Sequence, residues 1–176
     1  IDIDANALLL FRFNHGRALR QSGTTLEFLQ TDAMQQLESL LETYPRAAVF
    51  FDNVLGQHLY RVRELERAEA DLNRIADRLR GREWGSVHDL FSGPSEPQRV
   101  PAQPMISVDA INTDQGPQAD GLTGTPLHKR LLAQVGGNGE WMDHLTSGVF
   151  PVGTHTRLIA WPFLPGYAHW LQAGWM

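Results

Sequence analysis

The sequence predicts an α/β protein with a mostly parallel sheet, helices on both faces of that sheet, and an antiparallel hairpin at the C-terminal end. Three observations lead to this fold class. The first half of the chain alternates strand-like and helical segments, the order that βαβ units require. Residues 92–126 then hold six of the ten prolines and predict a long loop. Two strand-like segments near the end flank Leu164-Pro165-Gly166, a sequence typical of a hairpin turn.

The first elements are a short strand and a helix. The chain opens on "IDID", and Asp4 or Asn6 can cap the following helix because their side chains accept hydrogen bonds from its free N–H groups. Apolar residues at helical spacing continue from Ala7, and Gly23 is expected to end the helix. A strand over residues 24–32 and a helix over residues 33–45 form the second unit.

The third unit begins with a fully apolar strand over residues 47–51, followed by a long amphipathic helix over residues 58–81. A fourth strand is predicted over residues 84–88. After the long loop, which includes a short extended piece at residues 105–111, come a helix over residues 126–136 and a strand over residues 140–146. A loop as long as 92–126 in a compact domain indicates a lid over a site or a disordered segment.

The composition excludes several classes of function. The 176 residues suit one domain, and none of them is cysteine, which excludes disulfides, thiol catalysis and Cys-ligated metals. The net charge of −5 gives no bulk indication of nucleic-acid binding, although a local basic patch stays open. The longest apolar runs are too short to span a membrane, and no signal peptide is visible. A cytoplasmic protein without a membrane partner is therefore expected.

Polar residues stand at the ends of all four predicted strands of the first half. They are Asp2 with Asp4, Asp32, Asp52 with Asn53, and His88 with Asp89. In open α/β sheets, ligands bind beyond the carboxyl ends of the strands, so these residues together indicate a binding site. Each acid taken alone is also explained as a helix cap or a turn residue. In the loop after the third strand, Gly56 is expected to let the chain pass close to this site.

The order of the elements and three short motifs resemble the class I S-adenosylmethionine-dependent methyltransferases, a Rossmann-like family, from its second strand onward. The motifs are "IDIDANAL", "LQTDAM" and "AVFFDNVLGQ", and the hairpin resembles that family's antiparallel seventh strand. The resemblance covers most of the chain. It implies that Asp2 binds the ribose of S-adenosylmethionine and that Asp32 meets the adenine amino group. Asp52 and Asn53 would then face the sulfonium and the substrate.

The function implied by this resemblance is methyl transfer from S-adenosylmethionine to an acceptor that the sequence does not identify. Aligning the reactants supplies much of the rate of such a transfer. Asn53 is expected to orient the substrate, and Asp52 or His88 to accept a proton. The 92–126 loop would cover the site. For His88, Asp89 and the pair Asp143-His144, structural roles stay open, and no metal site is predicted.

One departure from the family favours other functions. The family's first strand and glycine-rich loop would precede Ile1, so the predicted domain over residues 1–176 is N-terminally incomplete. A longer parent protein, an upstream segment or a partner chain that supplies the strand would each explain this. The unpaired sheet edges would favour a homo-oligomer. The alternatives are a non-catalytic methyltransferase-like binding or assembly module and another doubly wound nucleotide-binding protein, such as a dehydrogenase.

Overall fold

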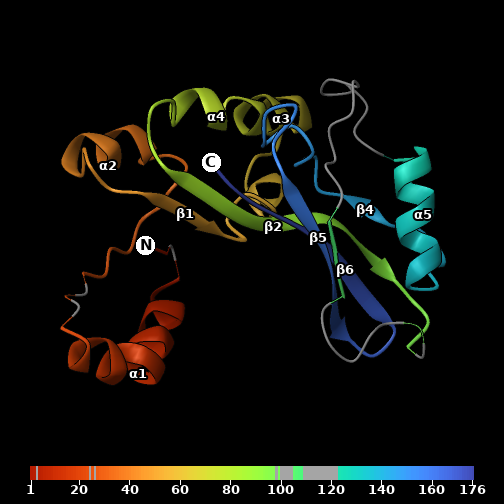
Figure 1. The fold of residues 1–176 in the computed structure, drawn as a ribbon, viewed down its shortest axis with the longest axis horizontal. Coiled ribbons are helices and arrows are strands. Elements are labelled where there is room, and N and C mark those ends of the chain that lie inside the picture. The colour runs from red at the N-terminus through yellow and green to blue at the C-terminus, as the bar shows by residue number, and fades with distance from the viewer. Residues whose placement is uncertain (3, 24, 26, 98, 100–104, 109–122) are drawn as a thin grey trace. The chain divides into compact units, whose positions relative to one another are not determined.

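The computed structural model describes the chain except for residues 3, 24, 26, 98, 100–104 and 109–122 (Figure 1). By their internal contacts the residues divide into two compact units, Ile1–Ala47 and Ala48–Met176. Each unit is described by itself below. Most of the loop predicted over residues 92–126 lies outside the described residues.

The first unit contains the helices α1 (Ala5–Gln21) and α2 (Leu37–Thr43). Helix α1 begins where the sequence predicts, because the side chain of Asp4 accepts a hydrogen bond of 2.8 Å from the backbone N–H of Asn6. Among their described residues, the two segments predicted as strands form an isolated parallel bridge between Asp2 and Gln30 and no named strand. Two backbone hydrogen bonds of 3.1 and 3.0 Å flank this bridge.

The second unit contains a mixed sheet with the strand order β1-β2-β6-β5-β3, and a short strand, β4, also pairs with β2. The bounds are Val49–Asp52 for β1, Trp84–Pro94 for β2, Met105–Val108 for β3, Met142–Asp143 for β4, Thr156–Leu164 for β5 and Tyr167–Trp175 for β6. Strands β5 and β6 form the hairpin expected around Pro165 and Gly166, with Leu164 paired to Tyr167.

The prediction of a mostly parallel, Rossmann-like sheet is wrong. Among the strands that the structure describes, β1 and β2 are the one parallel pair, and all other pairings are antiparallel. In the described parts of residues 1–4 and 24–32, the single bridge stands where parallel strands were expected. Nine of the eleven residues of β2 are buried. This continuous burial shows that both faces of β2 are covered. A central strand can be covered on both faces whether its neighbouring strands run parallel or antiparallel to it.

The connection from β1 to β2 contains several short helices where one long helix was predicted. In place of one helix over residues 58–81, it contains the 3₁₀ turn η1 (His58–Tyr60), α3 (Leu65–Asn73) and α4 (Ile75–Arg78). The apolar stripe that predicted the helix is buried in its second half, where Leu72, Ile75 and Leu79 have no exposed surface. Leu65, in its first half, is 60% exposed. The stripe thus fixes the packing of this segment, while the helix is interrupted at Arg74, which caps α3 and α4.

Strand β2 is longer than predicted and reaches Pro94, so the first residues of the expected 92–126 loop belong to the sheet. Within that segment β3 lies inside the predicted extended piece and pairs with β5. Helix α5 (Pro126–Gln134) begins with proline, after Thr125, whose side chain accepts a hydrogen bond from the backbone N–H of His128. The main core joins α5 to β2, β5 and β6. Its buried members are Leu90, Phe91, Leu131, Val135, Trp141, Leu158, Ala160, Ala168 and Trp170.

We expect Leu131→Ala to lower the free energy of unfolding by about 2–5 kcal/mol, because it leaves a cavity between α5 and the sheet. Leu131 is 1% exposed, and its carbonyl oxygen accepts a hydrogen bond from the indole of Trp170. Urea unfolding followed by tryptophan fluorescence measures the effect. Lys129→Ala is the control on the same helix, since Lys129 is exposed. Equal losses in both variants would contradict this description of the core.

Candidate functional site

A β-bulge in β2 brings two polar residues onto one face of the sheet. The pairing of β2 with β6 shifts between Asp89 and Phe91, so Leu90 has no partner in β6. Because side chains alternate along a strand, one extra residue reverses the alternation. Asp89 and Ser92, three positions apart, therefore project from the same face. His88 projects from the opposite face.

The centre of the site is a hydrogen-bonded pair on this face, Asp89 in β2 and His169 in β6. The Oδ1 atom of Asp89 lies 2.7 Å from Nδ1 of His169. The other carboxylate oxygen accepts a bond of 2.9 Å from the side-chain amide of Asn53, and the Asn53 carbonyl accepts the backbone N–H of Asp89 at 3.1 Å. Both oxygens of a nearly buried carboxylate are thus satisfied.

This arrangement keeps Asp89 ionised. Burial by itself raises the pKa of the Asp89 carboxyl, but the hydrogen bonds from His169 and Asn53 and the nearby imidazoles together outweigh it, so the pKa lies below its ordinary value. A carboxylate only accepts hydrogen bonds, so Nδ1 of His169 carries the proton. In the neutral ring, Nε2 then has the lone pair.

Three aromatic rings surround the imidazole of His169. The ring centres of Phe163, Trp161 and Tyr167 lie 5.0, 5.6 and 5.6 Å from that of His169. Phe163 and Trp161 are 50% and 37% exposed. Within the described part of the chain, Nε2 of His169 forms no hydrogen bond, and it is not fully buried. It is the nitrogen that a ligand can reach, beside an apolar surface.

Asn53 and Gly56 hold the loop after β1 against Asp89. Asn53 has a φ of +53°, a left-handed conformation that asparagine adopts more readily than most residues. A Cβ atom at Gly56 would lie 2.6 Å from Oδ1 of Asn53 and 2.7 Å from the backbone nitrogen of Asp89. Only glycine fits this close approach of the loop to β2.

A second network on the same face is closed to ligands. Nδ1 of His144 lies 2.8 Å from the carbonyl oxygen of Gly56, so Nδ1 donates, and Nε2 at 2.9 Å accepts the hydroxyl of Ser92. The phenol of Tyr167 donates to the same hydroxyl at 3.3 Å. Ser92 and His144 are 2% and 1% exposed, and burial lowers the pKa of His144. We conclude that this network fastens the loop to β2.

His88, predicted to accept a proton, is fully buried on the other face. Its Nδ1 lies 2.8 Å from the Ser86 hydroxyl, and its Nε2 lies 3.2 Å from the side-chain carbonyl of Gln172. Its ring stacks on Phe150 with centres 5.6 Å apart. Burial lowers the pKa of His88 to about 4, so the imidazole is neutral near pH 7. Both of its hydrogen-bond partners are side chains.

The other residues predicted for the site lie in different places. Asp52 is exposed at the end of β1, next to Asn53, and has no recorded part in the described network. Asp2 and Asp32 belong to the first unit, at the ends of the two segments joined by the parallel bridge. Asp2 accepts the backbone N–H of Asp4 at 2.8 Å, and Asp32 accepts those of residues 34 and 35 at 3.0 and 3.2 Å. Both acids thus also act as local caps.

Sequence reasoning missed His169. The alternation in β6 places Tyr167, His169, Leu171 and Ala173 on one face, which is visible in the sequence. A histidine among aromatic residues on that face was a usable signal. Its partner Asp89 lies 80 residues earlier, and no local pattern joins the two.

The comparisons with known proteins give no family for this chain: no family model, no curated protein and no solved structure matches it. Among the described residues, no group of three or more His, Asp or Glu side chains could hold a metal ion. None of the helices in the described part of the chain combines the length and the apolar character needed to cross a membrane.

We expect Gly56→Ala to lower the free energy of unfolding by about 1–3 kcal/mol, because the added methyl group forces Asn53 and the Asp89 backbone apart. Chemical denaturation measures the loss, and the amide resonance of Asp89 should shift in NMR spectra. Gln57→Ala, at the exposed neighbouring position, is the control. A Gly56→Ala variant as stable as Gln57→Ala would show that the loop does not need the close approach.

Burial of His88 predicts that acid destabilises the protein. The folded pKa of about 4 lies below the ordinary 6.5, so only the unfolded chain binds this proton between these pH values. Stability should therefore be full above about pH 6.5 and fall toward about pH 4, by at most about 1.4 kcal/mol per pH unit for this group. Burial lowers the pKa values of His144 and His128 as well, which adds to the slope.

Urea unfolding across this pH range tests the assignment. His88→Gln should be less stable than the wild type at neutral pH and should show a shallower fall with acid. His155→Gln, at an exposed position, should keep the wild-type slope. An unchanged slope in His88→Gln would mean that another group causes the acid sensitivity.

Proposed function

We propose that this chain acts in methyl transfer from S-adenosylmethionine and that His169 is the general base that removes a proton from the acceptor. The observation that carries the proposal is the 2.7 Å hydrogen bond between Asp89 and His169. It fixes the tautomer of the ring and leaves Nε2 as the basic atom, which is the arrangement that general-base catalysis uses.

The surroundings of His169 suit this role. Its side chain is 14% exposed, which is enough for contact through one edge, while that of Asp89 is 4% exposed. Asn53 holds the carboxylate from the other side, so the pair has little freedom to turn away. Trp161 and Phe163 offer an apolar surface to an acceptor that brings an O–H or N–H group to Nε2.

Binding of the adenosine part of the cofactor by Asp2 and Asp32 stays part of the proposal. Asp2 forms a parallel bridge with Gln30, and Asp32 lies two residues after Gln30. A carboxylate oxygen that accepts one N–H keeps a second lone pair, so the local bond made by Asp2 leaves capacity for a ribose hydroxyl. When bound, S-adenosylmethionine supplies an activated methyl group, and the chain has to position the acceptor and take up its proton.

A non-catalytic binding module is the second candidate, and one observation favours it. His88, Ser92 and His144 are almost fully buried and have hydrogen-bonded partners, as expected of residues that stabilise a fold. In this function the Asp89–His169 pair would order the aromatic surface without moving a proton.

The decisive experiment combines binding and turnover. We expect S-adenosylmethionine and S-adenosylhomocysteine to bind in calorimetry, and Asp2→Asn and Asp32→Asn to weaken both. His169→Gln should retain cofactor binding but lower the formation of S-adenosylhomocysteine with phenol, catechol or small-amine acceptors by about 10²–10⁴-fold. Asp89→Asn should also lower it and should change the tautomer of His169 seen by ¹⁵N NMR.

His155→Gln is the matched control, because it removes an exposed histidine away from the pair. Cofactor binding with full turnover in His169→Gln would remove His169 as the base but keep the methyltransferase proposal. Absence of cofactor binding in the wild type would overturn that proposal and support the binding module.

A further inference from the structure

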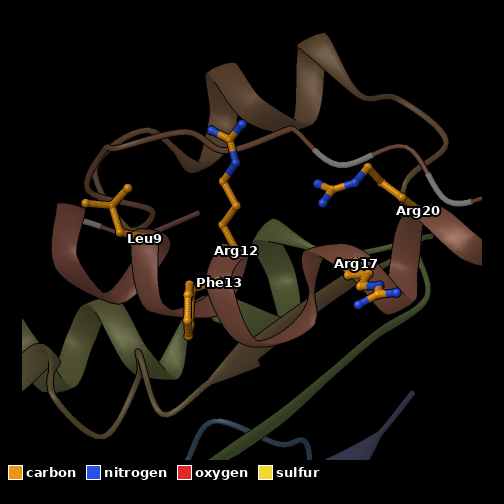
Figure 2. Close-up of a pocket in the computed structure, with 5 residues that line it drawn as sticks. All are labelled: Leu9, Arg12, Phe13, Arg17 and Arg20. Atoms are coloured by element: carbon orange, nitrogen blue, oxygen red, sulfur yellow. The ribbon is translucent and has the colours of Figure 1, made fainter.

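We propose that helix α1 carries a second binding site, for a ligand that combines phosphate with a flat ring, such as a nucleoside phosphate. The site is an open hollow of about 450 Å³ on α1 (Figure 2). Its lining residues are Leu9, Arg12, Phe13, Arg17 and Arg20. All five belong to one helix of the first unit, so the hollow is described within that unit alone.

The charge of α1 is the first argument. The helix contains Arg12, Arg17 and Arg20 and no acidic residue. Within the described part of the chain, none of the three guanidinium groups has a recorded ion pair. Other arginines do find partners on their own helices, since Arg74 pairs with Asp71 and Arg80 with Asp77. A local group of cations therefore stands on a chain whose net charge is −5. Such a group favours an anionic ligand.

A buried glycine lies beside two of the arginines that line the hollow. Arg12, Gly16 and Arg20 stand four residues apart, so they form one row along the helix surface. A Cβ atom at Gly16 would lie 3.3 Å from a guanidinium nitrogen of Arg20 and 3.6 Å from Cγ of Arg12. A larger side chain at Gly16 would press against both arginines, whose Cα atoms are about 12 Å apart along the axis. The volume falls within the range of small-molecule sites, about 300–1,000 Å³.

The apolar residues decide the class of ligand. Phe13 is 85% exposed and Leu9 61% exposed, and both line the hollow together with the arginines. A helix that lies on a membrane separates its cations from its apolar residues, whereas here they share one surface. An exposed aromatic ring beside cations is the arrangement that binds bases and phosphates together. S-adenosylmethionine has no phosphate, so this site does not depend on the proposed methyl transfer.

Binding assays with the whole chain test the site. The probes are a short fluorescein-labelled oligouridine, ATP as competitor, inorganic phosphate, and vesicles of phosphatidylcholine with phosphatidylserine. We expect the oligouridine or ATP to bind and the affinity to fall with salt. Each of Arg12→Gln, Arg17→Gln and Arg20→Gln should weaken binding about five- to tenfold, as expected for loss of a charge-assisted contact. Phe13→Ala should weaken it as well, because a base loses its stacking partner.

Two variants separate the site from net charge and from misfolding. Arg67→Gln makes the same charge change at an exposed position of α3 and should leave binding unchanged. Gly16→Leu keeps every charge but displaces the side chains of Arg12 and Arg20, so it should weaken binding. Helix formation should not suffer, because leucine favours helices more than glycine does. Circular dichroism checks that α1 remains folded in this variant.

Each outcome of these binding assays either supports or overturns the proposed site. Binding of ATP, with or without the oligouridine, identifies a free nucleotide as a sufficient ligand, and binding of oligouridine alone identifies a single strand as the source of the phosphate. The proposal is overturned if neither binds, if inorganic phosphate competes as well as ATP, or if only the vesicles bind. It is also overturned if Arg67→Gln weakens binding as much as the α1 variants, or if Gly16→Leu binds normally.

Discussion

The fold of the second unit depends on the hydrogen bonds that stabilise one buried carboxylate, that of Asp89. An ionised carboxylate in a protein interior is costly unless each oxygen has a partner. Here one oxygen takes a side chain from β6 and the other takes one from the loop after β1. The backbone carbonyl of Asp89 accepts the hydroxyl of Thr146, and its N–H donates to Asn53. Four distant parts of the chain thus meet at one residue, and satisfying its charge fixes their relative positions.

The polar residues around Asp89 divide by accessibility. His144 and Ser92 are closed in and fasten the loop that contains Gly56, while His88 belongs to the packing of the opposite face. His169 differs because its ring reaches the surface among aromatic residues. The buried residues keep the partly exposed His169 in place. A rigid surrounding of this kind is what a functional side chain needs, whether it moves a proton or orders a binding surface.

Features set by local chemistry could be predicted from the sequence, and features set by distant pairing could not. The cap at Asp4, the turn at Pro165 and Gly166, and the close approach at Gly56 each follow from what one or two residues allow. Asn53 was placed correctly at the end of a strand. The direction of the strands next to β2 left no trace in its apolar pattern, and His169 could not be linked to Asp89. His88 and Asp89 are adjacent in sequence, yet alternation sends them to opposite faces.

The bulge at Leu90 means that the length of β2 matters as much as its composition. The alternation of side chains reverses at this single residue. Odd-numbered residues of β2 before the bulge therefore share a face with even-numbered residues after it. If Leu90 paired with Trp170 and the strand continued without the bulge, Ser92 would face the apolar core, and Phe91 would face the loop that holds the histidines. A substitution in β2 changes one side chain at a time, whereas an insertion or deletion in a regularly paired part of the strand would move all the following side chains to the opposite face.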